Sequence, residues 1–412
     1  MTTTLRFGVL SHALHRPDHD PAIQLAADVR LAEHADRLGL DELWWTERRS
    51  GGWQIVADPM LMAAHAAAST RRIRLGAVVN PVRHHPANLV DGAAQLDHLT
   101  RGRFVLGLGA DVMVEDAATA GLSATDAEHA IEETVGAVAT LLRGKGRVSL
   151  TPRHAPWVVR DHTPHLLPRG RLDTRAVSFG GSAAPELAGT LGLGLVSTAA
   201  AQAVGLQREN RMAQTWLRAE AAAHQAGRVL SRDRWSVTTP IHLADTEIEA
   251  RRQVRHGIAR WAEYARASMP VEVPAGTDAD TLIDSLHAAG RGVVGTPAMA
   301  IEHLERVLDL SAGVGTVLLE VADWASPAET HASLERFARE VVPHVTGISR
   351  SRLAASAGGV GGVGTSGRVG RRAATPLPVH GPAPTPVRGV SRIHLDEGAR
   401  SRGRHAVDPS PD

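Results

Sequence analysis

Short runs of β-branched and other apolar residues alternate with longer amphipathic segments along the first 347 residues of the chain. Such runs predict buried strands, and the segments between them, apolar on one side only, predict helices. Eight runs predict strands, at Leu5–Leu10, Glu42–Thr46, Ile73–Val79, Arg103–Leu108, Arg175–Gly180, Leu193–Ser197, Trp235–Leu243 and Gly315–Val321. This alternation is typical of a parallel sheet covered by helices.

The predicted helices also have recognisable ends. Asp58-Pro59 and Thr296-Pro297 each place a capping side chain before a proline. Gly39 and Gly192 lie where a helix is expected to end, just ahead of the next strand. Between residues 22 and 38, one apolar stripe suited to packing on a sheet consists of Leu25, Val29, Ala32, Ala35 and Leu38.

Eight strands with intervening helices in about 340 residues predict an α/β fold, a (β/α)8 TIM barrel with insertions. The insertions are expected at Lys145–Leu172 and Pro270–Gly292. The competing fold is a doubly wound open sheet, which carries a glycine fingerprint after its first strand. Residues 7–12 have no such fingerprint, and the segment Gly107-Leu108-Gly109-Ala110-Asp111-Val112 lacks its third glycine. The barrel is therefore favoured.

The amino-acid composition of the sequence changes after Gly347. Residues 350–412 contain eleven glycines and seven prolines, with no aromatic residue and no periodic apolar pattern. We therefore predict a barrel domain over residues 1–347 and a disordered Gly/Pro/Arg-rich tail over 348–412. Ten arginines against four acidic residues give the tail a charge of +6 and leave the first 349 residues at −5. A basic arm for nucleic acid is one interpretation, but dispersed arginines without aromatic residues favour a passive extension.

Composition excludes several classes of protein. The chain is 43% hydrophobic and 22% charged, as globular proteins are. No run approaches the roughly 20 apolar residues of a membrane span, and Met1–Asp20 does not resemble a signal peptide, so we expect a soluble cytoplasmic protein. With no cysteine, thiolate metal sites and cysteine nucleophiles are excluded. Lys145 is the only lysine and therefore the only candidate for Schiff-base chemistry.

Active sites of such barrels lie at the carboxyl ends of the strands. The loops there are rich in polar residues, namely Ser11, His12, His15, His19, Thr46–Trp53, Asn80–Pro86, Gly109, Asp111, Gly181, Ser182, Ser197, Thr198, Glu320, Asp323 and Trp324. His12, His15 and His19 offer nitrogen ligands for a metal. Metal-dependent barrel hydrolases instead place two histidines one residue apart, so solvated loop histidines are the favoured interpretation and no metal is expected.

Three features of these loops suggest a bound organic anion or ring. The turn Gly180-Gly181-Ser182 precedes a short helix and offers N–H groups and a hydroxyl to a phosphate, although a capped glycine turn explains it equally well. Trp44, Trp45 and Trp53 could line a flat apolar pocket, but alternation sends the first two in opposite directions. Arg48 and Arg49 are either solvated or anion-binding.

Together these segments resemble the luciferase-like flavin-dependent monooxygenases, and among them the limonene-monooxygenase-like branch. The resemblance covers roughly residues 5–346. The segments that carry it are Leu43–Glu47, Ser50–Trp53, Ile73–Gly76, His84–Pro86, Gln95–Arg103, Gly189–Ser197 and Trp235–Asp245.

The resemblance implies a barrel that binds reduced FMN or the deazaflavin F420 and commonly forms a homodimer. In the FMN members, reduced flavin from a separate reductase reacts with O2 to give a C4a-peroxide, which oxygenates a small apolar substrate. The cofactor then carries the difficult chemistry, and the protein supplies a dry cavity and a phosphate site. This agrees with the absence of any evident nucleophile or metal site in the sequence.

Residues carry over from the family by position. Gly181 and Ser182 match the phosphate-binding turn, and Gly109 matches a glycine-rich segment. Val78 and Val79 fall where the family often has a non-proline cis peptide bond behind the flavin ring, a bond that costs about 3–4 kcal/mol. Asn80 then lies near the edge of the flavin.

The sequence departs from the family at several points. The branch usually reads Glu-His-His where this chain reads Glu47-Arg48-Arg49. Arginine does not exchange protons near neutral pH, so a proton shuttle there is lost. The loop after the third strand is one residue short, and Ala110-Asp111 replaces a common Pro-Gly.

Three interpretations follow from these departures. The leading one is an FMN-dependent monooxygenase in which Arg48 or Arg49 stabilises negative charge. The second is an F420-dependent hydride-transfer enzyme, whose acidic cofactor tail Arg48, Arg49 and Arg83 would accept. The third is a flavin-binding paralogue or partner subunit with little turnover.

Overall fold

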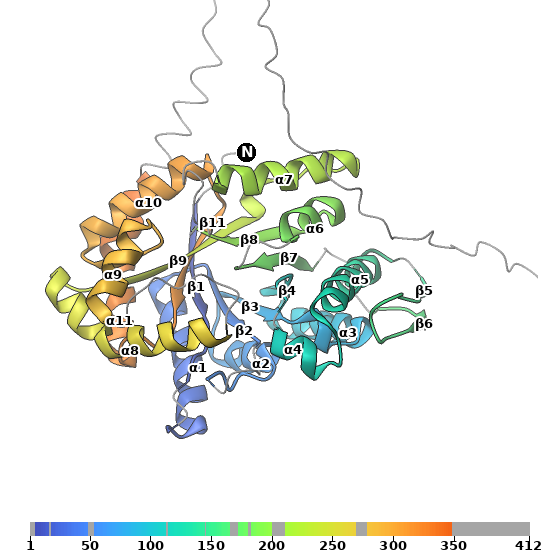
Figure 1. The fold of residues 1–412 in the computed structure, drawn as a ribbon, viewed down its shortest axis with the longest axis horizontal. Helices are drawn as coiled ribbons and strands as arrows, with labels where there is room; N and C mark the ends of the chain where they lie inside the picture. The colour runs from blue at the N-terminus through green and yellow to red at the C-terminus, as the bar shows by residue number, and fades with distance from the viewer. Residues whose placement is uncertain are drawn as a thin grey trace, which may run out of the picture. The chain divides into compact units, whose positions relative to one another are not determined.

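Eight parallel strands form a closed barrel (Figure 1). The structure is a computed structural model that describes residues 5–15, 18–47, 53–112, 114–144, 146–164, 172–179, 183–199, 211–268 and 278–347. The strands of the barrel are β1 (Arg6–Ser11), β2 (Glu42–Thr46), β3 (Arg74–Val79), β4 (Phe104–Gly109), β7 (Asp173–Ser178), β8 (Gly194–Thr198), β9 (Trp235–Leu243) and β11 (Thr316–Val321). They pair in that order, and β11 pairs with β1 to close the ring. The predicted barrel and all eight predicted strands are confirmed.

Helices pack around the strands. The helices are α1 (Pro21–Leu38), α2 (Pro59–Ser69), α3 (Pro86–Thr100), α4 (Val114–Thr119), α5 (Ala124–Arg143), α6 (Ala184–Leu191), α7 (Arg211–Gln225), α8 (Glu247–Ser268), α9 (Ala279–Ala288), α10 (Pro297–Ser311) and α11 (Pro327–Arg336). Short 3-10 turns lie at η1 (Pro81–Arg83) and η3 (Arg232–Arg234), and a π-helical turn, η4 (Phe337–Val341), follows α11. In Figure 1, α8, α9 and α11 lie to one side of the strands and α3 and α5 to the other.

The predicted helix ends are confirmed. The Asp58 carboxylate accepts a hydrogen bond from Met60 N at 2.8 Å, which caps α2. Gly39 and Gly192 end α1 and α6 in the left-handed region, at φ of 79° and 63°. The stripe on α1 also faces the core, since Val29, Ala32 and Ala35 are buried and Leu25 and Leu38 pack against the buried cluster.

Both predicted insertions contain secondary structure. The first holds an antiparallel hairpin of β5 (Val148–Leu150) and β6 (Val159–His162). The second holds α9 and is followed by β10 (Val293–Gly295), which pairs in parallel with the end of β9. They therefore lengthen connections of the barrel without interrupting its ring of strands.

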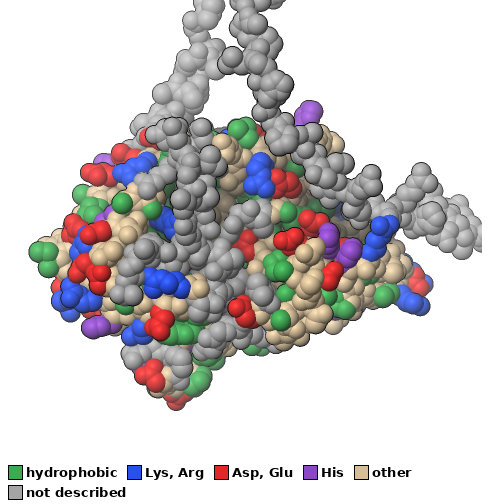
Figure 2. All heavy atoms as spheres, viewed as in Figure 1, with side chains coloured by type: hydrophobic (Ala, Val, Ile, Leu, Met, Phe, Trp, Pro, Cys, Tyr) green, Lys and Arg blue, Asp and Glu red, His purple; other side chains and the backbone are tan. Residues whose placement is uncertain are grey.

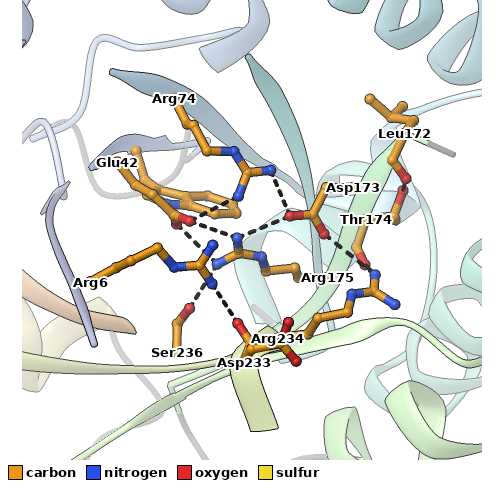
Figure 3. A network of polar contacts seen from close by, with 11 residues as sticks. Arg6, Glu42, Arg74, Leu172, Asp173, Thr174, Arg175, Asp233, Arg234 and Ser236 are labelled. Atoms are coloured by element: carbon orange, nitrogen blue, oxygen red, sulfur yellow. Dashed lines mark hydrogen bonds and ion pairs between the residues drawn. The ribbon is translucent and has the colours of Figure 1, made fainter. Parts of the chain in front are cut away.

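A buried ion network fills the barrel at the amino-terminal ends of the strands (Figure 3). Glu42 of β2 and Arg175 of β7 form two hydrogen bonds, of 2.7 and 2.9 Å. Arg74 of β3 binds Glu42 at 3.0 Å and Asp173 at 2.7 Å, and Arg175 binds the same Asp173 oxygen at 3.0 Å. Arg175 also donates to the Ser236 hydroxyl of β9 at 2.7 Å. The network thus joins opposite walls of the barrel.

Charge pairing keeps this network ionised. Burial alone would raise the pKa of the Glu42 and Asp173 carboxyls, because it penalises the charged form. The charges of Arg175 and Arg74 outweigh burial and hold both pKa values below their ordinary range. Burial likewise acts to lower the pKa of Arg175, but Glu42 and Asp173 raise it above the ordinary value.

The Trp44 indole covers this network. Its Nε1 donates to Glu42 at 3.0 Å, and the Arg175 guanidinium lies 5.2 Å from the ring centroid. The ring lies directly over Gly76, where a Cβ would overlap it. Ion network and indole together fill the amino-terminal end of the barrel, so a ligand site inside it belongs at the carboxyl end.

The face of the molecule in Figure 2 mixes acidic, basic and scattered hydrophobic side chains, without a large area of one kind. Within the ranges that the structure describes, no helix has the length and apolar character needed to cross a bilayer. The predicted tail at 348–412 lies outside those ranges, so its disorder stays a prediction.

Candidate active site

An apolar layer lies inside the barrel, directly next to the ion network on the side of the carboxyl ends of the strands. Seven strands contribute one side chain each, namely Leu10, Trp44, Val78, Val105, Val177, Val196 and Leu318. Phe179, which follows β7, is partly buried against them. This layer, called the apolar floor below, keeps water from the ion network underneath it.

Only one of the two predicted valines faces this floor. Val78 belongs to it, whereas Val79 packs between the barrel and its helices. The direction of Val79 follows from the alternation of side chains along β3. The described residues contain no cis peptide bond, so the bond between Val78 and Val79 is trans, and the expectation of a cis bond there was wrong.

Asn80 is fixed by bonds at both ends of its amide. Its Nδ2 donates to Asp116 at 3.0 Å, and its Oδ1 accepts from Val82 N at 3.2 Å, which caps η1. Its backbone N–H donates to the Glu47 carboxylate at 3.0 Å. The structure therefore shows Asn80 holding the loop after β3 in place, and its predicted position near the flavin stays a prediction.

Glu47 is the centre of a charged cluster beside Asn80. The fully buried carboxylate of Glu47 lies 2.7 Å from His84 Nε2 and 3.2 Å from Arg83 Nε. Arg83 also reaches Asp116 at 3.2 Å. This cluster ties the end of β2 to the loop after β3. Glu47 immediately precedes Arg48 and Arg49, the predicted catalytic residues, which lie outside the described residues.

The end of β4 is joined to the end of β7. The Asp111 carboxylate accepts from the Ser178 hydroxyl at 2.8 Å and from Phe179 N at 2.6 Å. Gly109 lies just before this contact, and a Cβ there would approach Val79 O to 3.2 Å, which is a tight contact with the backbone. These bonds fix the chain just ahead of Gly181 and Ser182, the predicted phosphate turn, which lie outside the described residues.

The candidate histidine ligands do not gather around a common point. The first of them, His12, pairs with Glu320 at 3.2 Å and His15 with Asp28 at 2.8 Å, while His19 is exposed. In the part of the chain that the structure covers, no group of three or more His, Cys, Asp or Glu is placed to hold a metal ion. The histidines at the end of β1 therefore form separate carboxylate pairs.

The three tryptophans of the β2 region also separate. Trp44 lies in the barrel interior, and Trp45 lies between the barrel and its helices, as the alternation predicts. Trp53 packs with its ring 5.8 Å from that of Tyr264 on α8. Both Trp44 and Trp45 are fully buried, so neither lines an open pocket.

Sequence comparison identifies the family. The model of the luciferase-like monooxygenases matches residues 5–313. The chain belongs to that family. It is 35% identical to limonene 1,2-monooxygenase of Rhodococcus erythropolis over 342 residues, which is 83% of this chain and 87% of the relative. It is 32% identical to 4-hydroxyprotoasukamycin monooxygenase of Streptomyces nodosus subsp. asukaensis, over 89% of this chain and 99% of the relative.

Solved structures of the family share the fold. The oxygenating constituent of 3,6-diketocamphane monooxygenase from Pseudomonas putida, in complex with FMN, superposes with a TM-score of 0.66 at 23% identity, over 82% of this chain and 98% of the other. F420-dependent enzymes are among the structural neighbours at 17% and 19% identity, which shows the fold alone. The shared fold confirms the predicted luciferase-like barrel, and the family model with the two relatives above confirms the predicted flavin-dependent monooxygenase.

The residues at the carboxyl end fit a flavin. A flavin ring presents flat apolar faces and a polar edge, and this end of the barrel offers the apolar floor with a polar rim around it. The rim includes the His12–Glu320 pair at the ends of β1 and β11 and the Glu47 cluster at the ends of the neighbouring β2 and β3. Reduced FMN is thus a cofactor that the donor set of this barrel can accommodate.

Sequence reasoning placed His12 and Glu320 at strand ends but did not pair them. The two residues are 308 positions apart in the sequence, and the pairing of β1 with β11 brings their side chains into contact. Asp116 of the Glu47 cluster was missed altogether. It lies on α4 and carries no local signal, because its role comes from the tertiary position of that short helix.

Proposed function

We propose that the protein oxygenates a small apolar organic substrate with O2 and reduced FMN, and that a separate flavin reductase supplies the reduced cofactor. The observation that carries this proposal is the apolar floor, which lies above a sealed ion network at the catalytic end of a luciferase-like barrel. The family's members named above are monooxygenases, one of them described as an oxygenating constituent with FMN bound.

Bound reduced FMN would supply the electrons that activate O2. The apolar floor, whose seven side chains are at most 6% exposed, would close the bottom of the site and exclude water, which strengthens every electrostatic interaction above it. Glu47 anchors the start of the loop with Arg48 and Arg49, whose fixed charge would stabilise developing negative charge. Asp111 fixes Phe179, and Gly181 and Ser182 would then bind the phosphate.

The experiment is an anaerobic titration of the purified protein with reduced FMN, with F420 in parallel. The FMN complex is then mixed with O2 in the presence of limonene as a trial substrate, and flavin absorbance and products are recorded. Tight FMN binding and an oxygenated product support the proposal. Binding of F420 alone would move the function to hydride transfer. Binding of neither would favour a non-catalytic partner subunit.

A homodimer in the cytoplasm completes the proposal. The adjacent helices α1, α2 and α3 each expose a large apolar side chain, namely Ile23, Leu61 and Leu99, at 65%, 69% and 65%. A contact between copies of the chain on this side would remove these side chains from water. Sedimentation of wild type and of Leu61→Glu tests this, and a monomer in both would contradict it.

A further inference from the structure

A buried polar chain crosses three neighbouring strands at the carboxyl end of the barrel. Thr238 of β9 hydrogen-bonds one oxygen of Glu320 of β11 at 2.5 Å, and the other Glu320 oxygen lies 3.2 Å from Nε2 of His12, just after β1. The three side chains are largely withdrawn from solvent, with His12 at 8% and Glu320 at 18% exposure. The carboxylate is therefore held on one side and directed toward the imidazole on the other.

These bonds define the roles of the two imidazole nitrogens. The Thr238 hydroxyl donates its single O–H in a hydrogen bond to Glu320, so the carboxylate is the acceptor. The other Glu320 oxygen then accepts the Nε2–H of His12. In the part of the chain that the structure covers, the His12 ring makes its hydrogen bond through Nε2 to Glu320, which leaves Nδ1 as the nitrogen available to take up or release a proton.

The His12 ring lies over the apolar floor. Leu10, two residues earlier on the same face of β1, belongs to that floor. The ring of Phe179, from the end of β7, lies 5.6 Å from the His12 ring in an edge contact. Three strands separate β1 from β7 in either direction around the barrel, so this contact spans its mouth. A ligand bound at this end of the barrel, above the floor, would therefore lie beside His12.

The other histidine–carboxylate pair on the rim is less suited to proton transfer. Glu47 is shared among His84, Arg83 and the backbone of Asn80, so its charge is already balanced by the Arg83 guanidinium. No arginine or lysine pairs with Glu320 in the described chain, which leaves its charge available to stabilise a protonated imidazole. Arg48 and Arg49 cannot exchange protons near neutral pH.

On the basis of the proposed function, we infer that His12 is the general acid–base residue of the reaction and that Glu320 positions it. Overall, substrate, O2 and reduced FMN give oxygenated substrate, water and oxidised FMN, and the two electrons and two protons of the reduced flavin end on the water. His12 takes one of these protons at Nδ1 and passes it to the departing oxygen, so it is unchanged after each turnover. Glu320 orients the ring and stabilises its protonated form.

The test compares His12→Gln and Glu320→Gln with the matched control His15→Gln. His15 makes the same kind of buried pair, with Asp28 on α1, but outside the chain of bonds described above. With reduced FMN, O2 and limonene as probes, His12→Gln should lower kcat about a hundredfold or more, and Glu320→Gln about tenfold. Substrate KM and the Kd of reduced FMN should change less than about threefold, and His15→Gln should match wild type.

Two further measurements separate proton transfer from a structural role. Added imidazole should restore activity to His12→Ala, because a small base can occupy the space left by the ring. In the flavin-free protein, nitrogen NMR of labelled histidine should show the His12 signals, assigned by their loss in His12→Gln, shifting in Glu320→Gln. Failure of imidazole rescue, or unshifted His12 signals, would count against the inference.

The outcomes also distinguish this inference from the proposed function. A wild-type protein that neither binds reduced FMN nor consumes O2 would overturn the proposed function. An active wild type together with a fully active His12→Gln would overturn the role of His12 alone. A loss of FMN binding in His12→Gln equal to its loss of activity would show a cofactor-binding role and reject the acid–base role.

Discussion

Glu42 and Arg175 form a bidentate ion pair inside the barrel, with hydrogen bonds of 2.7 and 2.9 Å. Their side chains are 0% and 1% exposed to solvent. Removing one partner of such a pair leaves an uncompensated buried charge. We therefore expect Arg175→Met to lower the free energy of unfolding by about 3–5 kcal/mol. Denaturant unfolding of the flavin-free protein measures this.

The double variant Glu42→Leu with Arg175→Met provides the control. It removes both charges, while Arg74 keeps its partner Asp173 at 2.7 Å. Much of the lost stability should return, because a hydrophobic pair can replace a buried ion pair at little cost. If the double variant were less stable than Arg175→Met alone, the network would contribute net stability beyond charge balance.

Gly76 is a second position in the barrel interior where an added side-chain atom would not fit. A Cβ there would overlap the Trp44 indole, which is itself held by Glu42 and by the stacked Arg175. Gly76→Ala should therefore destabilise the barrel by about 1–3 kcal/mol or more, as overpacking of a core does. Thermal unfolding checks this against Gly136→Ala on α5, where a Cβ meets open space and helix propensity favours alanine. Equal melting temperatures for the two variants would show that the indole can move.

The sequence predicted the strands because both faces of a barrel strand are buried, so each strand is a short apolar run that the local pattern shows. It did not predict the ion network, because Glu42 and Arg175 are 133 residues apart and meet only once the barrel closes. The same applies to His12 and Glu320: each was placed at a strand end, but only the register of β1 against β11 brings them together. Loop residues such as Asp116 depend on tertiary packing that no local pattern encodes.

Stability should fall as the pH drops below neutrality, and His303 is one reason. Burial lowers the pKa of His303 to about 4, and its Nε2 lies 2.8 Å from the Thr239 hydroxyl. The unfolded chain takes up the proton near pH 6.5, so the folded state loses stability as the pH falls from about 6.5 to about 4, by up to about 3 kcal/mol. Burial also lowers the pKa of His242, His287 and His331, which act in the same direction.

Thermal unfolding across this pH range, with wild type and His303→Gln compared, measures the contribution. Glutamine can still bond to Thr239 but does not titrate, so the variant should lose less stability on acidification. His65→Gln, at an exposed position of α2, is the matched control and should follow wild type. Identical pH profiles for wild type and His303→Gln would contradict the prediction.

Substitutions of Arg49 test whether this residue acts in the place of a histidine that the family usually has there. If residue 49 faces the reacting oxygen, Arg49→His should retain or raise turnover with reduced FMN and O2, because histidine can exchange protons there. Arg49→Met removes the charge without adding a base and should lower turnover about tenfold or more, by loss of electrostatic stabilisation. Stopped-flow and product analysis measure both, and unchanged kinetics in both variants would place the residue outside the site.

Ser182 tests the predicted phosphate turn separately from the ring site. If its hydroxyl binds the phosphate of FMN, Ser182→Ala should raise the Kd of FMN about tenfold, the effect of one hydrogen bond to a charged group. Riboflavin has the same ring but no phosphate, so its Kd should not change. Ser197→Ala, at the end of β8, where the hydroxyl accepts from the Trp235 indole at 3.1 Å, is the control for loss of a serine near the strand ends. Fluorescence titration with both flavins gives the comparison. Equal weakening of FMN and riboflavin by Ser182→Ala would mean that the turn supports the ring, and an unchanged Kd for both would place the phosphate elsewhere.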